Sequence, residues 1–307
     1  MVNNVSVTNN FQALLQERRN NLALIIGNGI NMHGKSSTTN SWKDLLMSLA
    51  KNDGFDFNKD MPSGIILTEF YDLLEIKSTS INSKKSLQKD FCTPMQDWKP
   101  YKHHKSIVAW AEQNQIPILT TNFDDVLAQA GDHKLLSQHT KGFTDFYPWD
   151  SYFGSIALDR PDQGFGIWHI NGMMRYKRSI RLGLTHYMGS VARARNLIHG
   201  GSDRNLFSGK NAENWAGVET WLHIIFNKPL LIFGLALNEN EVFLRWLLIE
   251  RAKYFKKFPK RRHDAWYVYN GGDEKKNEGK LYFLNGIGVI PVKVDSYEEL
   301  YGVKVWQ

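Results

Sequence analysis

Short apolar runs that alternate with helical patterns are the feature that most restricts how this chain can fold. The runs are rich in branched and aromatic side chains, which is typical of strands covered on both faces. They lie at 22–26 (LALII), 116–120 (IPILT), 165–170 (FGIWHI), 230–233 (LLIF), 265–269 (AWYVY) and 289–294 (VIPVKV). Helical periodicity lies between them, at 42–49, 104–112, 126–130 and 239–254.

Strands that alternate with helices predict a doubly wound, Rossmann-like α/β fold with a mostly parallel sheet. The stretch from residue 42 to residue 104 is too long for one crossover helix, so we expect a small helical module inserted after the first strand. Two polar stretches, 80–90 (SINSKKSLQKD) and 275–280, predict exposed loops. We expect the whole chain, 1–307, to form a single domain.

Composition excludes several classes of protein. The 307 residues are 42% hydrophobic, which is enough for one large core. A lone cysteine, Cys92, excludes a disulfide framework and a cysteine-based zinc cluster, and it fits a reducing cytoplasm. We find no apolar run of the roughly 20 residues that span a bilayer and no secretory signal pattern, so we expect a cytoplasmic protein without a membrane partner. The net charge of +7 permits direct nucleic-acid binding but does not require it.

The first predicted strand runs directly into two glycines, in the segment Gly27-Asn28-Gly29-Ile30-Asn31. Glycines after a buried strand let the backbone turn sharply and approach a phosphate group. A helix that follows would offer its free N–H groups to that phosphate. The third glycine of the full dinucleotide fingerprint is absent, so a tight turn without a ligand is the alternative.

A polar elbow follows the second predicted strand, in the segment Thr121-Asn122-Phe123-Asp124-Asp125. Open α/β sheets bind ligands at the carboxyl ends of their strands, where this elbow is expected to lie. The alternative for either aspartate is to cap the helix that begins near residue 126. We prefer the capping role for Asp125 and a ligand-binding role for Asn122.

The third predicted strand carries a histidine close to its end. Residues two apart in a strand share a face, so His169 and Asn171 are expected to point the same way. His169 has the only local side chain whose usual pKa suits a general base, because the amide of Asn171 cannot take a proton. The alternative is a core histidine bonded to a backbone carbonyl. A later strand leads into Gly234 and Leu235, after which Asn238 and Glu241 have the spacing of a capping box.

Taken in order, these motifs resemble those of the sirtuin family. The segment 27–31 (GNGIN) resembles the Gly-Ala-Gly-x-Ser motif of sirtuins, and 120–124 (TTNFD) resembles their Thr-Gln-Asn-Ile-Asp motif. The segment 234–237 (GLAL) stands where sirtuins carry Gly-Thr-Ser-Leu, and the resemblance spans roughly residues 22–248. The chain departs from the family at Asn171-Gly172, where sirtuins have His-Gly, and it lacks their four-cysteine zinc module.

Without the zinc module, the chain is most similar to bacterial sirtuin-like defence proteins, which hydrolyse NAD during phage infection. The resemblance implies an NAD glycohydrolase that needs no metal, with catalytic roles for Asn122, Asp124 and His169. The residues implied in binding NAD are Gly27, Asn28, Gly29, Asn31, Thr121, Asn122, Asp124, Asn171, Gly234, Leu235 and Asn238. Tyr187 is expected in the core, although it could pack beside the nucleotide.

The same resemblance implies partners and leaves alternatives open. It points to a large homo-oligomer that associates with a HerA-type DNA-translocating ATPase. One alternative is an NAD-dependent protein deacylase, against which the missing zinc module argues. The other is a module that senses NAD or ADP-ribose without catalysis, which the Asn171 departure makes credible.

Overall fold

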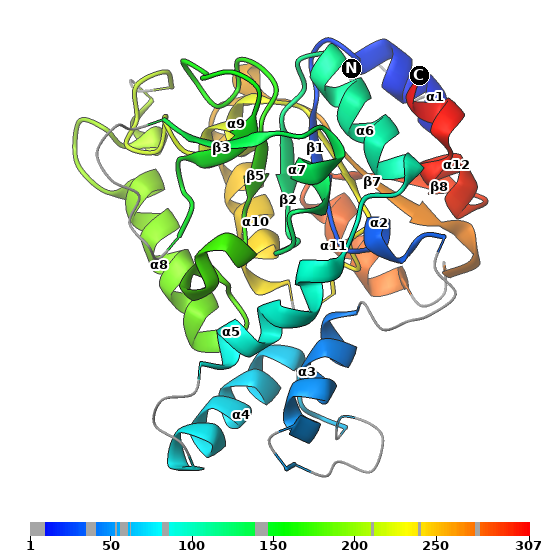
Figure 1. The fold of residues 1–307 in the computed structure, drawn as a ribbon. Helices are drawn as coiled ribbons and strands as arrows, with labels where there is room; N and C mark the ends of the chain where they lie inside the picture. Colours follow the sequence, from blue (N-terminus) through cyan, green and yellow to red (C-terminus); the bar gives the residue numbers. More distant parts are fainter. Residues whose placement is uncertain are drawn as a thin grey trace.

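A computed structural model provides the coordinates, and Figure 1 shows the fold. It describes residues 10–34, 41–52, 54–55, 61, 63–81, 86–138, 147–209, 212–238, 241–273 and 277–307.

One sheet of eight strands forms the centre of the described structure. Its spatial order is β3-β4-β5-β2-β1-β6-β7-β8. The bounds are β1 (Ala23–Ile26), β2 (Ile118–Thr120), β3 (Lys134–Ser137), β4 (Ser151–Gly154), β5 (Ile167–His169), β6 (Leu230–Phe233), β7 (Ala265–Asn270) and β8 (Ile290–Val294). The six neighbouring strands β5, β2, β1, β6, β7 and β8 are parallel to one another. β4 runs antiparallel to both β3 and β5. The predicted doubly wound α/β fold is confirmed.

Helices cover both faces of the sheet, because alternate strand residues point to opposite sides. In β1, Ala23 and Ile25 belong to one core, while Leu24 and Ile26 belong to the other. The first core also takes side chains from α8 (Leu184–His199), α9 (Leu222–Asn227), α10 (Val242–Lys257) and α11 (Glu278–Gly286). The second takes them from α1 (Phe11–Arg18), α6 (Lys102–Gln113), α7 (Val126–Ala130) and α12 (Tyr297–Tyr301).

Helices between β1 and α6 build a third core of their own. They are α3 (Trp42–Asn52), α4 (Leu67–Ile81), α5 (Leu87–Cys92) and the short 3-10 helix η1 (Thr93–Asp97). Figure 1 shows α3 and α4 extending away from the sheet, with α5 between them and the rest of the fold. This third core also includes Phe123 of the polar elbow, together with Ile180 and Leu182. The inserted helices therefore pack directly against the elbow.

Three predicted local features differ in the structure. The polar stretch 80–90 is not one loop, because α4 continues to Ile81 and the Ser86 hydroxyl caps α5 by accepting from the Lys89 N–H. The stretch 275–280 includes the start of α11 at Glu278, although residues 274–276 lie outside the described residues. Helix α10 begins at Val242, and the predicted start at Glu239 also lies outside them. Among the helices described, none has both the length and the apolar character needed to cross a membrane.

Candidate functional site

A cavity of about 580 Å³ lies at the carboxyl edge of the sheet. This volume is within the range of small-molecule sites in proteins. Residues within two positions of the ends of four parallel strands line it: Asn28 after β1, Asn122 after β2, Asn171 after β5 and Gly234 after β6. The inserted helices contribute an apolar wall that includes Phe91 of α5.

The structure brings most of the predicted ligand-binding residues into this one cavity. Those that line it are Asn28, Gly29, Thr121, Asn122, Asp124, Asn171, Gly234 and Leu235. Those that do not are Gly27, Asn31, His169 and Asn238. Two of these residues bond residues that do line the cavity: Asn31 bonds Asp124, and His169 bonds Asn122.

The glycines after β1 are required by close packing between two loops. A Cβ on Gly27 would lie 2.5 Å from the Gly234 carbonyl oxygen, and one on Gly29 would lie 2.9 Å from the Gly234 Cα. The loop N–H groups are largely occupied: Gly27 donates to Phe233 O and Gly29 donates to Gly234 O. Ile30 and Asn31 donate within the turn itself. The expected phosphate seat on free N–H groups is therefore wrong for these four residues.

Asn122 lines the cavity and carries a buried oxygen without a hydrogen-bond partner. Its backbone N–H donates to the Thr120 hydroxyl at 3.1 Å, which fixes the elbow, and its side-chain Nδ2 lies 3.5 Å from the Gly27 carbonyl oxygen. Its Oδ1 is buried and accepts no hydrogen bond. Buried polar atoms are nearly always bonded in proteins, so this oxygen marks a position where a ligand hydroxyl or water is expected.

Asp124 is held by a chain of side chains that begins in α6. The Tyr101 N–H donates to Nδ1 of His104, so the other ring nitrogen carries the hydrogen and donates to Asn31 Oδ1 at 3.0 Å. Asn31 Nδ2 in turn donates to Asp124 Oδ2 at 2.8 Å. Burial raises the pKa of Asp124 to about 6, while hydrogen bonds from the Val126 N–H and from Asn31 oppose the rise. Sequence reasoning missed His104, because its partner lies 73 residues away along the chain.

The two aspartates of the elbow have different roles from those expected. Asp124 Oδ1 accepts from the Val126 N–H at 3.0 Å and so caps α7. Asp125 makes no capping bond; its Oδ2 instead accepts from Arg175 Nε at 2.7 Å. The predicted capping role of Asp125 is therefore wrong, because Arg175 lies close enough to compete for its carboxylate. Asp124 combines the capping role with a position in the cavity wall.

His169 is sealed beneath the elbow and does not open into the cavity, contrary to expectation. Its side chain is 0% exposed, and Nδ1 lies 2.8 Å from the Asn122 carbonyl oxygen, to which it donates. Burial lowers its pKa, so the ring is neutral near pH 7. The geometry is that of the alternative kept open above, a core histidine bonded to a backbone carbonyl. His169 thus fixes the backbone that carries Asn122.

Asn171, two residues after the end of β5, lines the cavity. Its carbonyl oxygen accepts from the Arg181 N–H at 2.9 Å, and Gly172 follows with a φ of 94°. A Cβ on Gly172 would lie 2.2 Å from the Ser179 carbonyl oxygen, so only glycine fits this turn. The side chain that faces a ligand here is an amide, which cannot act as a base.

The loop after β6 approaches the cavity through its backbone. Gly234 has a φ of 69°, which favours glycine, and it lines the cavity together with Leu235. Asn238 is exposed and lies outside the cavity lining. The predicted capping box with Glu241 is wrong: Glu241 is the N-cap residue of α10, and it makes no side-chain capping bond.

Two tyrosine hydroxyl groups, like the amide oxygen of Asn122, are buried without a hydrogen-bond partner. Tyr187 and Tyr301 both line the cavity, and both phenol oxygens are buried without a hydrogen-bond partner. Tyr187 therefore packs in the core and borders the ligand space at once. Sequence reasoning missed Tyr301 because nothing in the local pattern of α12 separates it from an ordinary core tyrosine.

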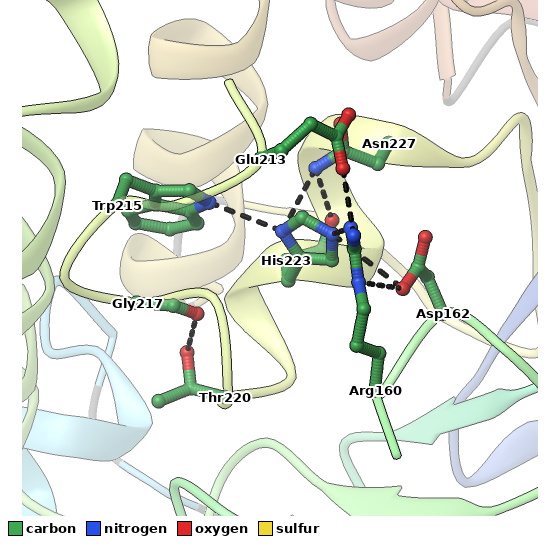
Figure 2. A network of polar contacts seen from close by, with 8 residues as sticks. All are labelled: Arg160, Asp162, Glu213, Trp215, Gly217, Thr220, His223 and Asn227. Atoms are coloured by element: carbon green, nitrogen blue, oxygen red, sulfur yellow. Dashed lines mark hydrogen bonds and ion pairs between the residues drawn. The ribbon is translucent and has the colours of Figure 1, made fainter. Parts of the chain in front are cut away.

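A separate polar cluster lies outside the cavity lining and joins α9 to two loops. In Figure 2, Arg160 pairs with Glu213 at 2.7 Å and with Asp162 at 3.3 Å. The Trp215 indole N–H donates to Nδ1 of His223 at 3.1 Å. This arrangement ties the loops to α9, and its role is structural.

Within the described residues, no group of three or more His, Cys, Asp or Glu side chains is placed to hold a metal ion. No protein-family model matches the chain, and no curated protein matches it.

Proposed function

We propose that this protein is an NAD glycohydrolase, which cleaves NAD to nicotinamide and ADP-ribose. The observation that carries the proposal is the meeting of Asn122, Asp124 and Asn171 in one ligand-sized cavity at the carboxyl edge of the sheet. Ligands of open α/β sheets bind at this edge. The unpartnered Asn122 Oδ1 supports the same proposal, because it is suited to accept a ribose hydroxyl.

Two cavity residues, Asn122 and Asp124, contact the substrate in this reaction. Asn122 holds the ribose hydroxyls and the attacking water, while Asp124 accepts from the carboxamide of nicotinamide. The ribose passes through an oxocarbenium-like state as the bond to nicotinamide breaks. His169 acts through the Asn122 backbone and is a positioning residue, since it has no access to the cavity.

Release of nicotinamide from NAD by the purified protein tests the proposal. Asn122→Ala should lower kcat by about 10²- to 10⁴-fold, the range expected when a positioned catalytic group is lost. Asn114→Ala is a matched control, because that amide bonds the Trp110 carbonyl oxygen at the end of α6, outside the cavity lining. Equal activity of both variants would contradict the proposed site.

A second candidate is a module that binds NAD or ADP-ribose without turnover. The presence of Asn171 in the cavity and the sealing of His169 favour it, because neither residue can exchange a proton with a ligand there. Calorimetric binding of NAD without nicotinamide release would support this function over hydrolysis. Deacylation of an acetylated peptide, with NAD consumed, would instead support the deacylase alternative.

The biological setting of the proposed activity is bacterial antiphage defence by NAD depletion in the cytoplasm. A free NAD hydrolase would deplete the cell's own cofactor, so its activity must be restrained. We propose that restraint comes from a homo-oligomer, capping a HerA-type DNA-translocating ATPase. Light scattering that finds only monomers, together with full activity of the isolated protein, would contradict this assembly.

A further inference from the structure

Glu241 places a second carboxyl group in the cavity wall. It directly precedes α10, where its backbone N–H donates to Asn238 O and its carbonyl accepts from the Arg245 N–H, each at 3.0 Å. Its side chain makes no capping bond. No salt bridge reaches this carboxyl group from any residue that the structure describes. With respect to the described part of the chain, this carboxyl group is therefore available to a ligand.

Aromatic packing connects the first turn of α10 with the end of β5, where Asn171 lies. Phe243 packs on Trp149, with ring centroids 6.4 Å apart, and Trp149 packs on Tyr147 at 4.5 Å. The Tyr147 hydroxyl donates to the carbonyl oxygen of Ile170, the residue before Asn171. The start of α10 is thus connected by packing to the segment that carries Asn171.

Tyr187 of α8 supplies an independent sign of a ligand in this region. It is 1% exposed, it lines the cavity with Glu241 and Asn171, and its hydroxyl has no hydrogen-bond partner. Burial, followed by the negative charge of Glu241, raises the pKa of Tyr187 well above the usual value for a phenol. Both side chains line the same cavity, and a water or ligand hydroxyl there would satisfy the Tyr187 hydroxyl.

The cationic side chains that the structure describes in this region bond other groups. Arg245, on the same helix, donates to the Leu237 carbonyl oxygen at 2.9 Å, and Lys280 of α11 donates to Ala236 O at 2.7 Å. Arg181 lies over the Tyr147 ring at 4.7 Å. Burial raises the pKa of Glu241 to about 7, so the group exchanges a proton in the physiological range.

We propose that Glu241 is the general base that activates water in this cavity, with Tyr187 orienting the same water. The proposal rests on the proposed NAD hydrolysis and supplies the base that Asn171 cannot be. An O–H bond of water breaks and its proton goes to the Glu241 carboxylate, while the oxygen bonds to C1′ of the ribose. The bond from C1′ to nicotinamide breaks, its electron pair stays on the ring nitrogen, and nicotinamide leaves neutral.

Glu241→Gln tests the proposal, with NAD as the probe. The variant should bind NAD within threefold of the wild-type affinity, while kcat falls by about 10²- to 10⁴-fold. The wild-type kcat should rise with pH up to about 7, and the residual activity of the variant should lack this rise. Glu250→Gln is the control: it removes a carboxylate from the same helix, where Glu250 bonds His199 and Lys253 outside the cavity lining.

A second variant separates catalysis from folding. In Glu241→Ala, added formate can enter the vacated space, and we expect it to restore part of the lost kcat. Failure of formate to restore activity, or a Glu241→Gln kcat within threefold of wild type, would overturn the role of Glu241 while leaving NAD hydrolysis standing. If the wild-type protein itself releases no nicotinamide, the proposed function fails, and the catalytic role of Glu241 fails with it.

Discussion

At the scale of single residues, the sequence identified which side chains cluster but not what each one does. Asn122 is predicted because it follows a buried strand, and the family resemblance implies Asp124 and Asn171; all three line the cavity. The sealing of His169 could not be predicted, because strand alternation gives the face of a residue but not the depth at which the loop above covers it. His104 and Glu241 were missed since long-range contacts define their positions.

Asp124 should make the stability of the protein depend on pH. Burial raises its folded-state pKa from 3.8 to about 6, so between these values the folded state binds more protons than the unfolded state. Stability therefore falls as pH rises across this window, by about 3 kcal/mol for a shift of about two units. Asp124→Asn removes this titration. The difference in unfolding free energy between wild type and variant, measured in urea from pH 4 to 7, should fall over that window; a constant difference would contradict the burial argument.

His169→Ala should act mainly through stability. The substitution empties a fully buried site and leaves the Asn122 carbonyl oxygen without its donor, at a cost of about 2–4 kcal/mol. Because the backbone of Asn122 then moves more freely, kcat should also fall, but the pH dependence of kcat should remain that of the wild type. If a folded His169→Ala protein lost the pH dependence of kcat, His169 would be the general base.

At the scale of helices and strands, a strand could be predicted where its residues form a continuous apolar run. The six strands from the apolar runs were found because parallel strands covered on both faces are continuously apolar. The edge strand β3, with the sequence KLLS, was missed because its burial is intermediate or low throughout. β4, with the sequence SYFG, is fully buried but carries only two large apolar side chains, too few to stand out as a run.

The cluster of Figure 2 should stabilise α9 without contributing to ligand binding. His223 is 0% exposed, and its loss would leave the buried Trp215 N–H without its acceptor. His223→Ala should therefore lower the free energy of unfolding by about 2–4 kcal/mol, as seen for buried groups that leave both a cavity and an unpaired donor. NAD affinity measured below the unfolding transition should remain within threefold of wild type, and a larger loss would mean that this cluster communicates with the cavity.

At the scale of the whole molecule, the inserted helices complete the site. Their core includes Phe123 of the elbow, and the rings of Phe91 and Phe123 meet edge to face at 5.9 Å. Length alone predicted an insertion between the first strand and α6, but it could not indicate which surface the insertion covers. In the structure, α5 lines the cavity through Phe91, which packs on Phe123 of the elbow, so the insertion encloses part of the cavity.

Two substitutions in the inserted helices can distinguish a contribution to the cavity wall from a contribution to stability alone. Phe91→Ala removes a ring that lines the cavity, whereas Leu74→Ala removes a side chain of the same core that does not. Both should lower the free energy of unfolding, by about 3–5 kcal/mol for the phenylalanine and about 2–5 kcal/mol for the leucine. Only Phe91→Ala should weaken NAD binding, by about tenfold or more, because an apolar contact of that size contributes over 1.4 kcal/mol. Calorimetric titration of the folded variants decides the matter: an equal loss of affinity in both would mean that the insertion acts by holding the fold together, and not by forming the wall of the site.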